Sequence, residues 1–188
     1  LKEELIKGLS QVGCNIIDIG VGPTPMLYYS NFLNNSEAGI MITGSHNPPS
    51  HNGFKIVKDK VSFFGVDLKN LAKSAQNYDF VEKKSSYKKN DIEDKYVNML
   101  IKNLNQEKNL NVVWDAGNGS AGKVMKKIAN HIKGEKILLY EDIDGEFPNH
   151  HPDPSDQDTL IDLIKSVKEN KMDLGIAFDG DGDRIGIL

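Results

Sequence analysis

The sequence has little or none of several features that mark specialised classes of protein. Cys14 is the only cysteine among 188 residues. An internal disulfide and a multi-thiolate metal site are therefore excluded, and a reducing compartment is expected. No apolar run reaches the roughly 18 residues of a membrane-spanning helix, and no basic segment followed by an apolar core marks a signal peptide. We expect a cytoplasmic protein without a membrane partner.

A strong charge of either sign is also missing. Lysine and arginine number 23 against 27 aspartate and glutamate residues, which leaves a formal net charge of -4. A net charge this small favours neither a nucleic-acid polyanion nor an acidic membrane surface as a partner. We therefore expect no nucleic-acid partner, and a small neutral or anionic metabolite fits the composition better.

The two ends of the chain suggest a piece of a longer protein. The first residue is Leu1 rather than methionine, and the last residues, Arg184 to Leu188, have the pattern of a strand that stops early. The length suits one large domain or two small ones. We expect a fragment cut from a larger chain.

Helical spacing and short apolar runs alternate along the chain. Helices are predicted at residues 1–12, 26–33, 66–77, 91–104, 123–132 and 155–170, and strands at 14–19, 38–42, 54–57, 112–114, 137–139 and 172–178. This alternation is typical of an α/β fold with mostly parallel strands. The strand at 38–42 is apolar throughout, as a strand covered on both faces would be. Thr24 is predicted to cap the helix that follows it.

A polar stretch divides this pattern. Residues 78–90 contain few apolar side chains and a cluster of lysines and serines. Such a composition predicts a solvated stretch at the edge of a domain rather than an anion site. We therefore expect one domain over residues 1–90 and another over residues 91–188.

A candidate phosphate carrier lies in the sequence TGSHNPP at residues 43–49. Ser45 follows a glycine at the end of a predicted strand, where free backbone N–H groups form a nest that suits an anion. A serine hydrolase is the rival interpretation, but its nucleophile elbow needs glycines where Thr43 and Asn47 stand. Neighbouring side chains are also expected to point apart, which makes His46 a poor base. A plain turn with an incidental serine remains the alternative.

A candidate metal site lies in DGDGDR at residues 179–184. The glycines permit backbone turns that let Asp179, Asp181 and Asp183 converge. Clustered carboxylates repel one another without a cation, and oxygen ligands beside phosphate favour Mg²⁺. An EF-hand calcium loop needs glycine where Arg184 stands, and a ligand-free hairpin turn is the other alternative.

Two further signals carry less weight. GNGSAG at residues 117–122, with Glu141 about twenty residues on, fits a dinucleotide fingerprint. A nicotinamide-dependent oxidoreductase domain is therefore the alternative function, although it leaves the other two loops unexplained. His150 and His151 with Asp153 lack a third zinc ligand at the proper spacing, so they predict a structural loop.

Other stretches accompany the two loops in a fixed order. They are GPTP at 22–25, NGFK at 52–55, DAGNG at 115–119 and GEFPNHHPDP at 145–154. Together with TGSHNPP and DGDGDR they resemble the α-D-phosphohexomutase family, and most of all its bacterial phosphomannomutase/phosphoglucomutase branch. The resemblance covers nearly the whole chain.

The resemblance implies both a fold and an activity. The fold would be two consecutive three-layer α/β domains with mixed, mostly parallel sheets, cut from a four-domain enzyme. Residues 1–90 would be the later part of the first domain, with the phosphoserine loop, and residues 91–188 the second domain, with the metal-binding loop. The activity would be an intramolecular phosphotransfer that interconverts hexose 6-phosphate and hexose 1-phosphate through a phosphoserine and a bisphosphorylated sugar.

The same resemblance implies roles for individual residues. Ser45 would be the phosphoserine, Lys55 the general acid/base and Arg184 the arginine beside the phosphate site. His46 would contact a proton or the phosphate, or hold the shape of the loop. The implied ligands of Mg²⁺ are the phosphate on Ser45 and the carboxylates of Asp179, Asp181 and Asp183.

The implied substrate is a mannose or glucose phosphate. Three carboxylates outweigh one divalent cation, and a phosphoserine adds roughly -1.5 to -2 charges near neutral pH. The parts of the enzyme beyond this chain must then be basic where they face the substrate, so we expect the fragment alone to be inactive. The full-length enzyme is expected to be monomeric.

Overall fold

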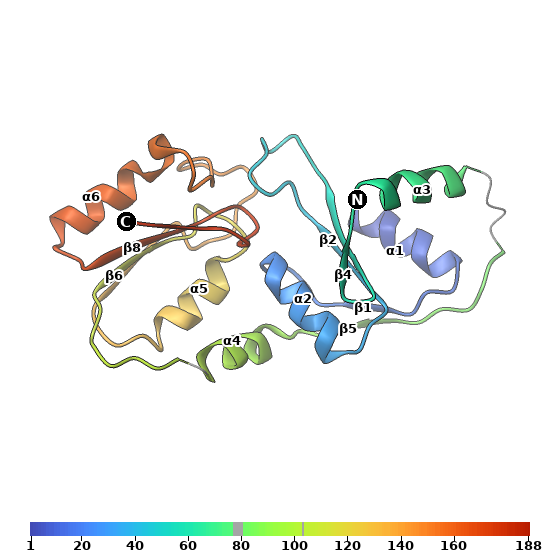
Figure 1. The fold of residues 1–188 in the computed structure, drawn as a ribbon, viewed down its shortest axis with the longest axis horizontal. Coiled ribbons are helices and arrows are strands. Elements are labelled where there is room, and N and C mark those ends of the chain that lie inside the picture. The colour runs from blue at the N-terminus through green and yellow to red at the C-terminus, as the bar shows by residue number, and fades with distance from the viewer. Residues whose placement is uncertain (77–80, 103) are drawn as a thin grey trace. The chain divides into compact units, whose positions relative to one another are not determined.

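The computed structural model describes residues 1–76, 81–102 and 104–188, which form two compact units of helices and short strands (Figure 1). Unit 1 and unit 2 are interleaved in sequence. Unit 1 comprises Leu1–Gly20, Leu27–Ile42 and Phe54–Ile92, and unit 2 comprises Val21–Met26, Thr43–Gly53 and Glu93–Leu188. The loop that carries Ser45 therefore packs with the later half of the chain. The domain boundary predicted after residue 90 stays a prediction.

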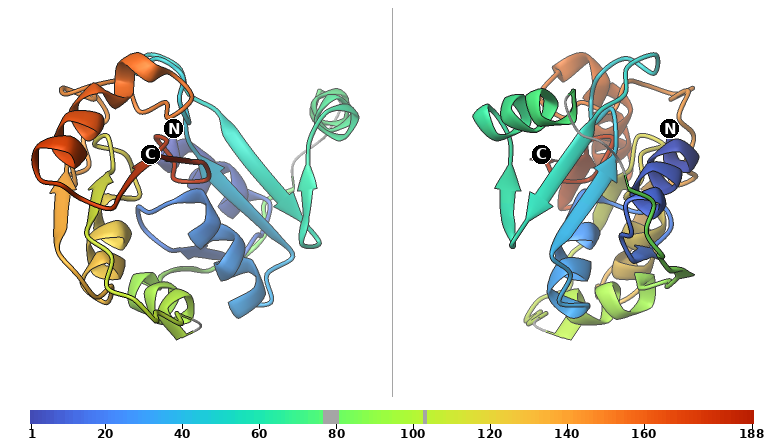
Figure 2. Two further views of the ribbon diagram at one scale, coloured as in Figure 1. Left: turned by 60° about the vertical axis from the view of Figure 1, so that its left-hand side comes forward. Right: turned by 90° about the vertical axis from the view of Figure 1, so that its right-hand side faces the viewer.

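Unit 1 contains two separate sheets. Strands β1 (Ile16–Asp18) and β5 (Tyr87–Lys89) pair in parallel, with Ile16 opposite Tyr87. The antiparallel sheet has the order β2-β3-β4 (Figure 2), and its strands are β2 (Ala38–Ile42), β3 (Phe54–Lys58) and β4 (Val61–Phe63). The helices are α1 (Lys2–Gln11), α3 (Val66–Ala75) and the larger part of α2 (Thr24–Leu33), whose first three residues belong to unit 2.

The turn between β3 and β4 shows how local sequence shapes this sheet. Asp59 and Lys60 have φ angles of 51° and 66°, and they are the two residues between the paired positions Lys58 and Val61. Two successive positive φ angles are typical of a type I′ turn, whose twist matches that of the strands it joins.

One prediction in unit 1 needs correction, and another stretch contains a strand that was not predicted. β2 was expected to be covered on both faces, but only Gly39 is buried and Ala38 is exposed. Gly39 is buried because it lies against Asn31 of α2, whose Oδ1 would be 2.8 Å from an added Cβ. The solvated stretch contains β5, whose exposed side chains give no periodic signal. Residue 77 of the predicted helix and residues 78–80 lie outside the described residues.

Unit 2 is built around a four-stranded sheet of order β7-β6-β8-β9. The first three strands are parallel and β9 runs antiparallel to β8. The strands are β6 (Val112–Asp115), β7 (Lys136–Leu139), β8 (Leu174–Phe178) and β9 (Ile185–Ile187). The helices are α4 (Glu93–Lys102), α5 (Gly122–Ala129), the 3₁₀ helix η1 (Gln157–Leu160) and α6 (Ile161–Glu169). The predicted α/β class with parallel and antiparallel pairing is confirmed.

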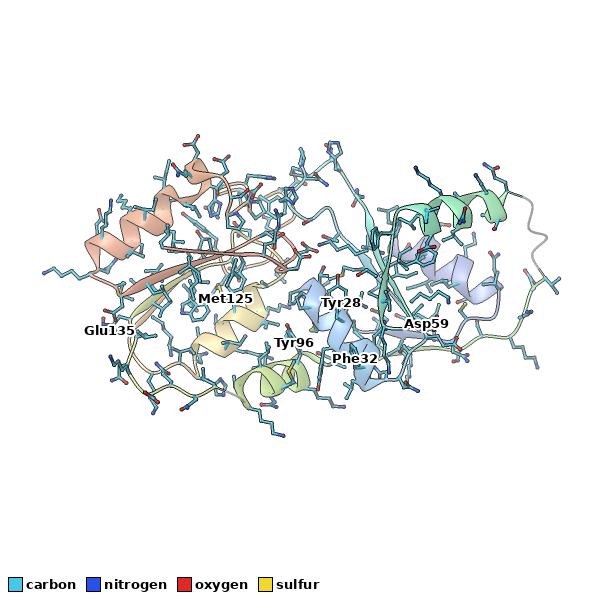
Figure 3. All side chains as sticks on the ribbon, in the orientation of Figure 1. Tyr28, Phe32, Asp59, Tyr96, Met125 and Glu135 are labelled. Carbon is cyan, nitrogen blue, oxygen red and sulfur yellow. The ribbon has the colours of Figure 1, made fainter. Side chains whose placement is uncertain are left out.

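The core of unit 2 follows from alternation along the strands. Val112 and Trp114 pack with Met125 of α5, whereas Val113 packs with Leu163 of α6. Successive strand side chains point to opposite faces of a sheet, so helices cover both faces and unit 2 has three layers (Figures 1 and 3). Met125 and Leu163 are almost fully buried, and each such side chain stabilises the fold by roughly 1.5–3 kcal/mol.

The helix boundaries in unit 2 differ from the predicted ones. A helix was expected to begin at residue 155, but α6 begins at Ile161 after η1. The cause is Asp156, whose side chain accepts a hydrogen bond of 3.0 Å from the N–H of Asp158 and so caps η1. α5 ends at Ala129 rather than at residue 132. In the described ranges, no helix is long and apolar enough to span a bilayer.

Candidate functional site

Two aspartates stand where parallel strands of unit 2 end. Asp115 is the last residue of β6, and Asp179 follows β8 directly. The two strands pair in parallel, with Asp115 opposite Ala177, so their carboxyl ends share one edge of the sheet. Both aspartates have no exposed surface. Ligands of α/β sheets gather at this edge, which makes it the first place to look for a functional site.

The loop after β8 wraps its backbone around the carboxylate of Asp179. Oδ1 of Asp179 accepts hydrogen bonds of 3.0 Å from the N–H groups of Asp183 and Arg184. Oδ2 accepts from Nε and Nη2 of Arg184 at 3.1 and 3.0 Å. Gly182 has a φ of 64°, a conformation that a side chain rarely allows. The loop therefore turns back on itself around one buried anion.

This turn brings the three predicted carboxylates together. One oxygen each from Asp179, Asp181 and Asp183 lies within 4.8 Å of the others. Asp179 and Asp181 are buried and Asp183 is exposed. Burial raises the pKa of Asp179, the N–H of Arg184 lowers it, and the charge of Asp181 raises it further, so the net shift is upward. A cation at this point would stabilise the ionised carboxylates.

The donor set fits a hard divalent cation. All three donors are carboxylate oxygens, the ligand type that ions such as Mg²⁺ and Ca²⁺ prefer. Among residues 1–76, 81–102 and 104–188, this is the only cluster of potential metal ligands that meets the same distance limit. The acidic cluster, defined as Asp179, Asp181 and Asp183, could therefore hold a metal ion.

The serine loop reaches the acidic cluster directly. Oγ of Ser45 donates a hydrogen bond of 3.2 Å to Oδ2 of Asp179, across 134 positions of sequence. The N–H of Ser45 donates to Oγ1 of Thr43 at 2.8 Å. Ser45 has a φ of 53°, so the chain turns sharply where the hydroxyl projects. The structure thus joins the two loops that the sequence singled out.

His46 lies closer to Ser45 than expected. The two side chains were predicted to point apart, but Nδ1 of His46 is 3.3 Å from Oγ of Ser45. The left-handed conformation of Ser45 rotates the two side chains toward one another. Nη2 of Arg184 also donates a hydrogen bond to Nδ1 of His46. A ring nitrogen that accepts from a guanidinium is a poor general base, so a hydrolase arrangement gains no support.

Lys55 lies in unit 1, on β3. It stands opposite Met41 of β2 in the antiparallel pair and is half-buried. Its role as a general acid/base stays a prediction.

Two residues that the sequence placed in structural roles also contact the loops. Thr24 was predicted to be a helix cap, but α2 begins at Thr24 itself, and its hydroxyl donates a hydrogen bond to Oδ2 of Asp181. Nε2–H of His151 donates a hydrogen bond to the backbone carbonyl oxygen of His46. Thr24 lies in GPTP at 22–25 and His151 in GEFPNHHPDP at 145–154, two of the stretches that carry the family resemblance. Membership of these motifs was the sequence signal that pointed to a role near the site.

His150 is held beside the site by Asp115. Its Nε2 lies 3.0 Å from Oδ2 of Asp115 and its Nδ1 lies 3.0 Å from the carbonyl oxygen of His151. Burial lowers the pKa of His150, but the hydrogen bond to Asp115, the one to His151 and the charges of Asp115 and Asp162 raise it, and the net shift is upward. The structural role predicted for this loop fits these contacts.

Two glycines of the possible dinucleotide fingerprint, Gly119 and Gly122, face the protein's own backbone. A Cβ at Gly119 would lie 2.8 Å from the carbonyl oxygen of Gly180, and one at Gly122 would overlap the carbonyl oxygen of Glu141. Glu141 itself pairs with Lys126 at 2.5 Å. The glycines therefore permit close packing within unit 2, and the oxidoreductase alternative finds no phosphate cradle here.

Comparison with known proteins decides the family. Residues 94–188 match the model of phosphoglucomutase/phosphomannomutase α/β/α domain II, and residues 1–82 match that of domain I. The chain belongs to the phosphoglucomutase/phosphomannomutase family. The resemblance inferred from the sequence motifs is thereby confirmed, and nothing in these matches supports an oxidoreductase.

Members of this family resemble the chain along its whole length. It is 43% identical over 188 residues to a phosphomannomutase/phosphoglucomutase of Pseudomonas putida and 36% identical over 190 residues to a phosphoglucomutase of Neisseria gonorrhoeae. Each match covers 100% of this chain and 41% of the relative. A crystal structure of a phosphoglucomutase/phosphomannomutase family protein from Burkholderia thailandensis has a TM-score of 0.89 and 36% identity, over 100% of this chain and 43% of that one. The chain therefore spans about two fifths of the length of the relatives it matches.

Proposed function

We propose that this chain carries the phosphate-transfer loop and the metal loop of a phosphohexomutase. The enzyme would interconvert hexose 6-phosphate and hexose 1-phosphate through a phosphoserine and a bisphosphorylated sugar. The observation that supports this most directly is the 3.2 Å hydrogen bond between Oγ of Ser45 and Oδ2 of Asp179, a member of the acidic cluster. A hydroxyl beside a carboxylate cluster is suited to carry a phosphoryl group next to a divalent cation.

Phosphoryl transfer needs mainly alignment and neutralisation of charge. Ser45 would carry the phosphoryl group, and the tight turn at this residue would hold its oxygen in one direction. The guanidinium of Arg184 donates two hydrogen bonds to Asp179 and one to His46, so it would orient both groups around the phosphate. Mg²⁺ held by the acidic cluster and by the phosphate on Ser45 would supply the counter-charge. Lys55 would exchange a proton with the sugar hydroxyl.

Further parts of the proposal concern the whole protein. The substrate class is a mannose or glucose phosphate, in keeping with the names of the relatives. Residues 1–90 would belong to the first domain of the enzyme and residues 91–188 to the second. We propose a monomeric enzyme in the cytoplasm, which is consistent with its single cysteine.

The proposal is tested by loading Ser45. The native full-length protein is incubated with glucose 1,6-bisphosphate and Mg²⁺, and the intact mass and the modified peptide are determined. We expect one added phosphoryl group on Ser45, together with conversion of glucose 1-phosphate to glucose 6-phosphate. Ser45→Ala should abolish both signals, because no other group replaces the hydroxyl.

The matched control is Ser50→Ala. Ser50 is an exposed serine of the same loop region, and its Oγ lies 3.5 Å from Nδ1 of His51. This variant should load and turn over as the wild type does. Phosphate on another residue, or full turnover by Ser45→Ala, would contradict the proposal.

A further inference from the structure

Thr24 is joined to the acidic cluster at two points. Its Oγ1 donates a hydrogen bond to Oδ2 of Asp181, 157 positions away in the sequence. Its backbone N–H donates a second one, of 2.8 Å, to the carbonyl oxygen of Asp181. Thr24 has no exposed surface and Asp181 is 2% exposed. The hydroxyl and the backbone N–H of Thr24 thus both donate hydrogen bonds to Asp181, and both residues are buried.

Packing fixes the position of Thr24 independently of these hydrogen bonds. A Cβ at Gly182 would lie 2.9 Å from Cβ of Pro23 and 2.9 Å from Cβ of Ala121. The acidic loop therefore lies in close contact with the residue before Thr24. Met26, two residues further on, is 1% exposed. The segment Val21–Met26 belongs to unit 2 with the acidic cluster, and it forms a rigid support for the loop.

A metal ligand must be held at one orientation to bind well. The buried carboxylate of Asp181 lies in one cluster with the carboxylates of Asp179 and Asp183, with one oxygen of each within 4.8 Å of the others. Repulsion between these anions would turn the side chain of Asp181 away from the cluster if nothing opposed it. A hydrogen bond from Oγ1 of Thr24 to one carboxylate oxygen fixes that rotation and offsets part of the desolvation cost.

We propose that Thr24 is a positioning residue that holds the carboxylate of Asp181 in the orientation needed to bind a divalent cation. The proposal rests on the proposed function only in taking the acidic cluster to be a metal site. It concerns binding rather than turnover, so it can be measured without any sugar phosphate.

The experiment is a Mn²⁺ titration of the full chain, in which electron paramagnetic resonance measures free Mn²⁺ and Mg²⁺ is then added as a competitor. Mn²⁺ prefers the same oxygen ligands as Mg²⁺. Thr24→Val keeps the shape of the side chain but removes the hydroxyl, and we expect it to weaken binding about 10-fold to 100-fold, the usual effect of losing a group that orients a ligand. Thr24→Ser keeps the hydroxyl and should bind close to the wild type.

The matched control is Thr159→Val. Thr159 is 8% exposed, and the carbonyl oxygens of Asp153 and Asp156, at 2.7 and 2.8 Å, share the single hydrogen of its hydroxyl. Loss of this hydroxyl removes a part-buried threonine hydrogen bond that does not involve a carboxylate of the acidic cluster. We expect a lower melting temperature with unchanged Mn²⁺ affinity.

Three outcomes would overturn the proposal. They are wild-type affinity in Thr24→Val, equal weakening in Thr159→Val, and a wild type that binds no Mn²⁺. Failure of the proposed function would look different, because Ser45 would then remain unloaded by the sugar bisphosphate. Weaker Mn²⁺ binding in Thr24→Val with recovery in Thr24→Ser supports the role of Thr24 whether or not Ser45 is loaded.

Discussion

Gly180 lies so close to the backbone carbonyl oxygen of Ser45 that a side chain at position 180 would overlap that oxygen. Gly180 is the second residue of the acidic loop, and Ser45 carries the hydroxyl that contacts Asp179. The direct contact between the two loops therefore depends on the absence of one methyl group.

Gly180→Ala should separate the two loops. The added methyl group would also lie 3.3 Å from Cγ of Pro152, so it has no room to relax on that side. Overpacking of this kind typically lowers the free energy of unfolding by about 1–3 kcal/mol. We expect phosphate loading of Ser45 by glucose 1,6-bisphosphate to slow markedly, measured by intact mass over time in the native protein. Gly145→Ala is the control, because no atom lies within 4 Å of a Cβ at that position, and equal loading in both variants would count against the prediction.

Removal of metal should lower the stability of the fold. A ligand that binds only the native state at 100 times its dissociation constant adds about 2.7 kcal/mol to the free energy of unfolding. We expect a gain of this size on saturation with Mg²⁺, measured by urea denaturation, and its reversal by a chelator. Asp181→Asn should abolish the gain, whereas Asp158→Asn, at an exposed site in η1, should retain it. A gain that persists in Asp181→Asn would place the ion elsewhere.

The pair formed by His150 and Asp115 should make stability depend on pH. The folded-state pKa of His150 is raised above its ordinary 6.5, so the native state favours the protonated ring. The stability gained is fully present below the unfolded pKa and is lost as the pH rises through the folded pKa. Asp115 and Asp162 are the charges that act on His150, and the ring of Tyr140 packs edge-on against it.

His150→Gln tests this dependence. The difference in unfolding free energy between wild type and variant should be larger at about pH 6 than at about pH 8.5, because protonation stabilises only the wild type. Fluorescence of Trp114, the single tryptophan, can follow urea unfolding at each pH. A difference that stays constant across this range would refute the assignment of a protonated His150.

The core beneath α6 should respond to loss of volume. Leu163 has no exposed surface and packs against Val113 and Ala177. Leu163→Ala should lower the free energy of unfolding by about 2–5 kcal/mol, because it leaves a cavity as well as removing apolar contacts. Ile161→Ala, on the same helix but 60% exposed, should change it by less than about 0.5 kcal/mol. Similar losses in the two variants would show that α6 does not pack as described.

Local sequence was enough to predict much of this protein. The alternation of helical spacing and short apolar runs predicted the α/β class with mostly parallel strands, and β6 pairs in parallel with β7 and β8. The convergence of Asp179, Asp181 and Asp183 was predictable because two intervening glycines allow the loop to turn within six residues. Both features depend on neighbours in the sequence, where residue type constrains the backbone directly.

Contacts between distant segments could not be derived in this way. No local pattern pairs the hydroxyl of Ser45 with the carboxylate of Asp179. Likewise, no local pattern pairs Thr24 with Asp181 or Gly180 with the carbonyl oxygen of Ser45. Such contacts arise when packing of unit 2 brings segments more than a hundred positions apart into one buried volume. There, close approach and the need to pair buried polar groups select the partners.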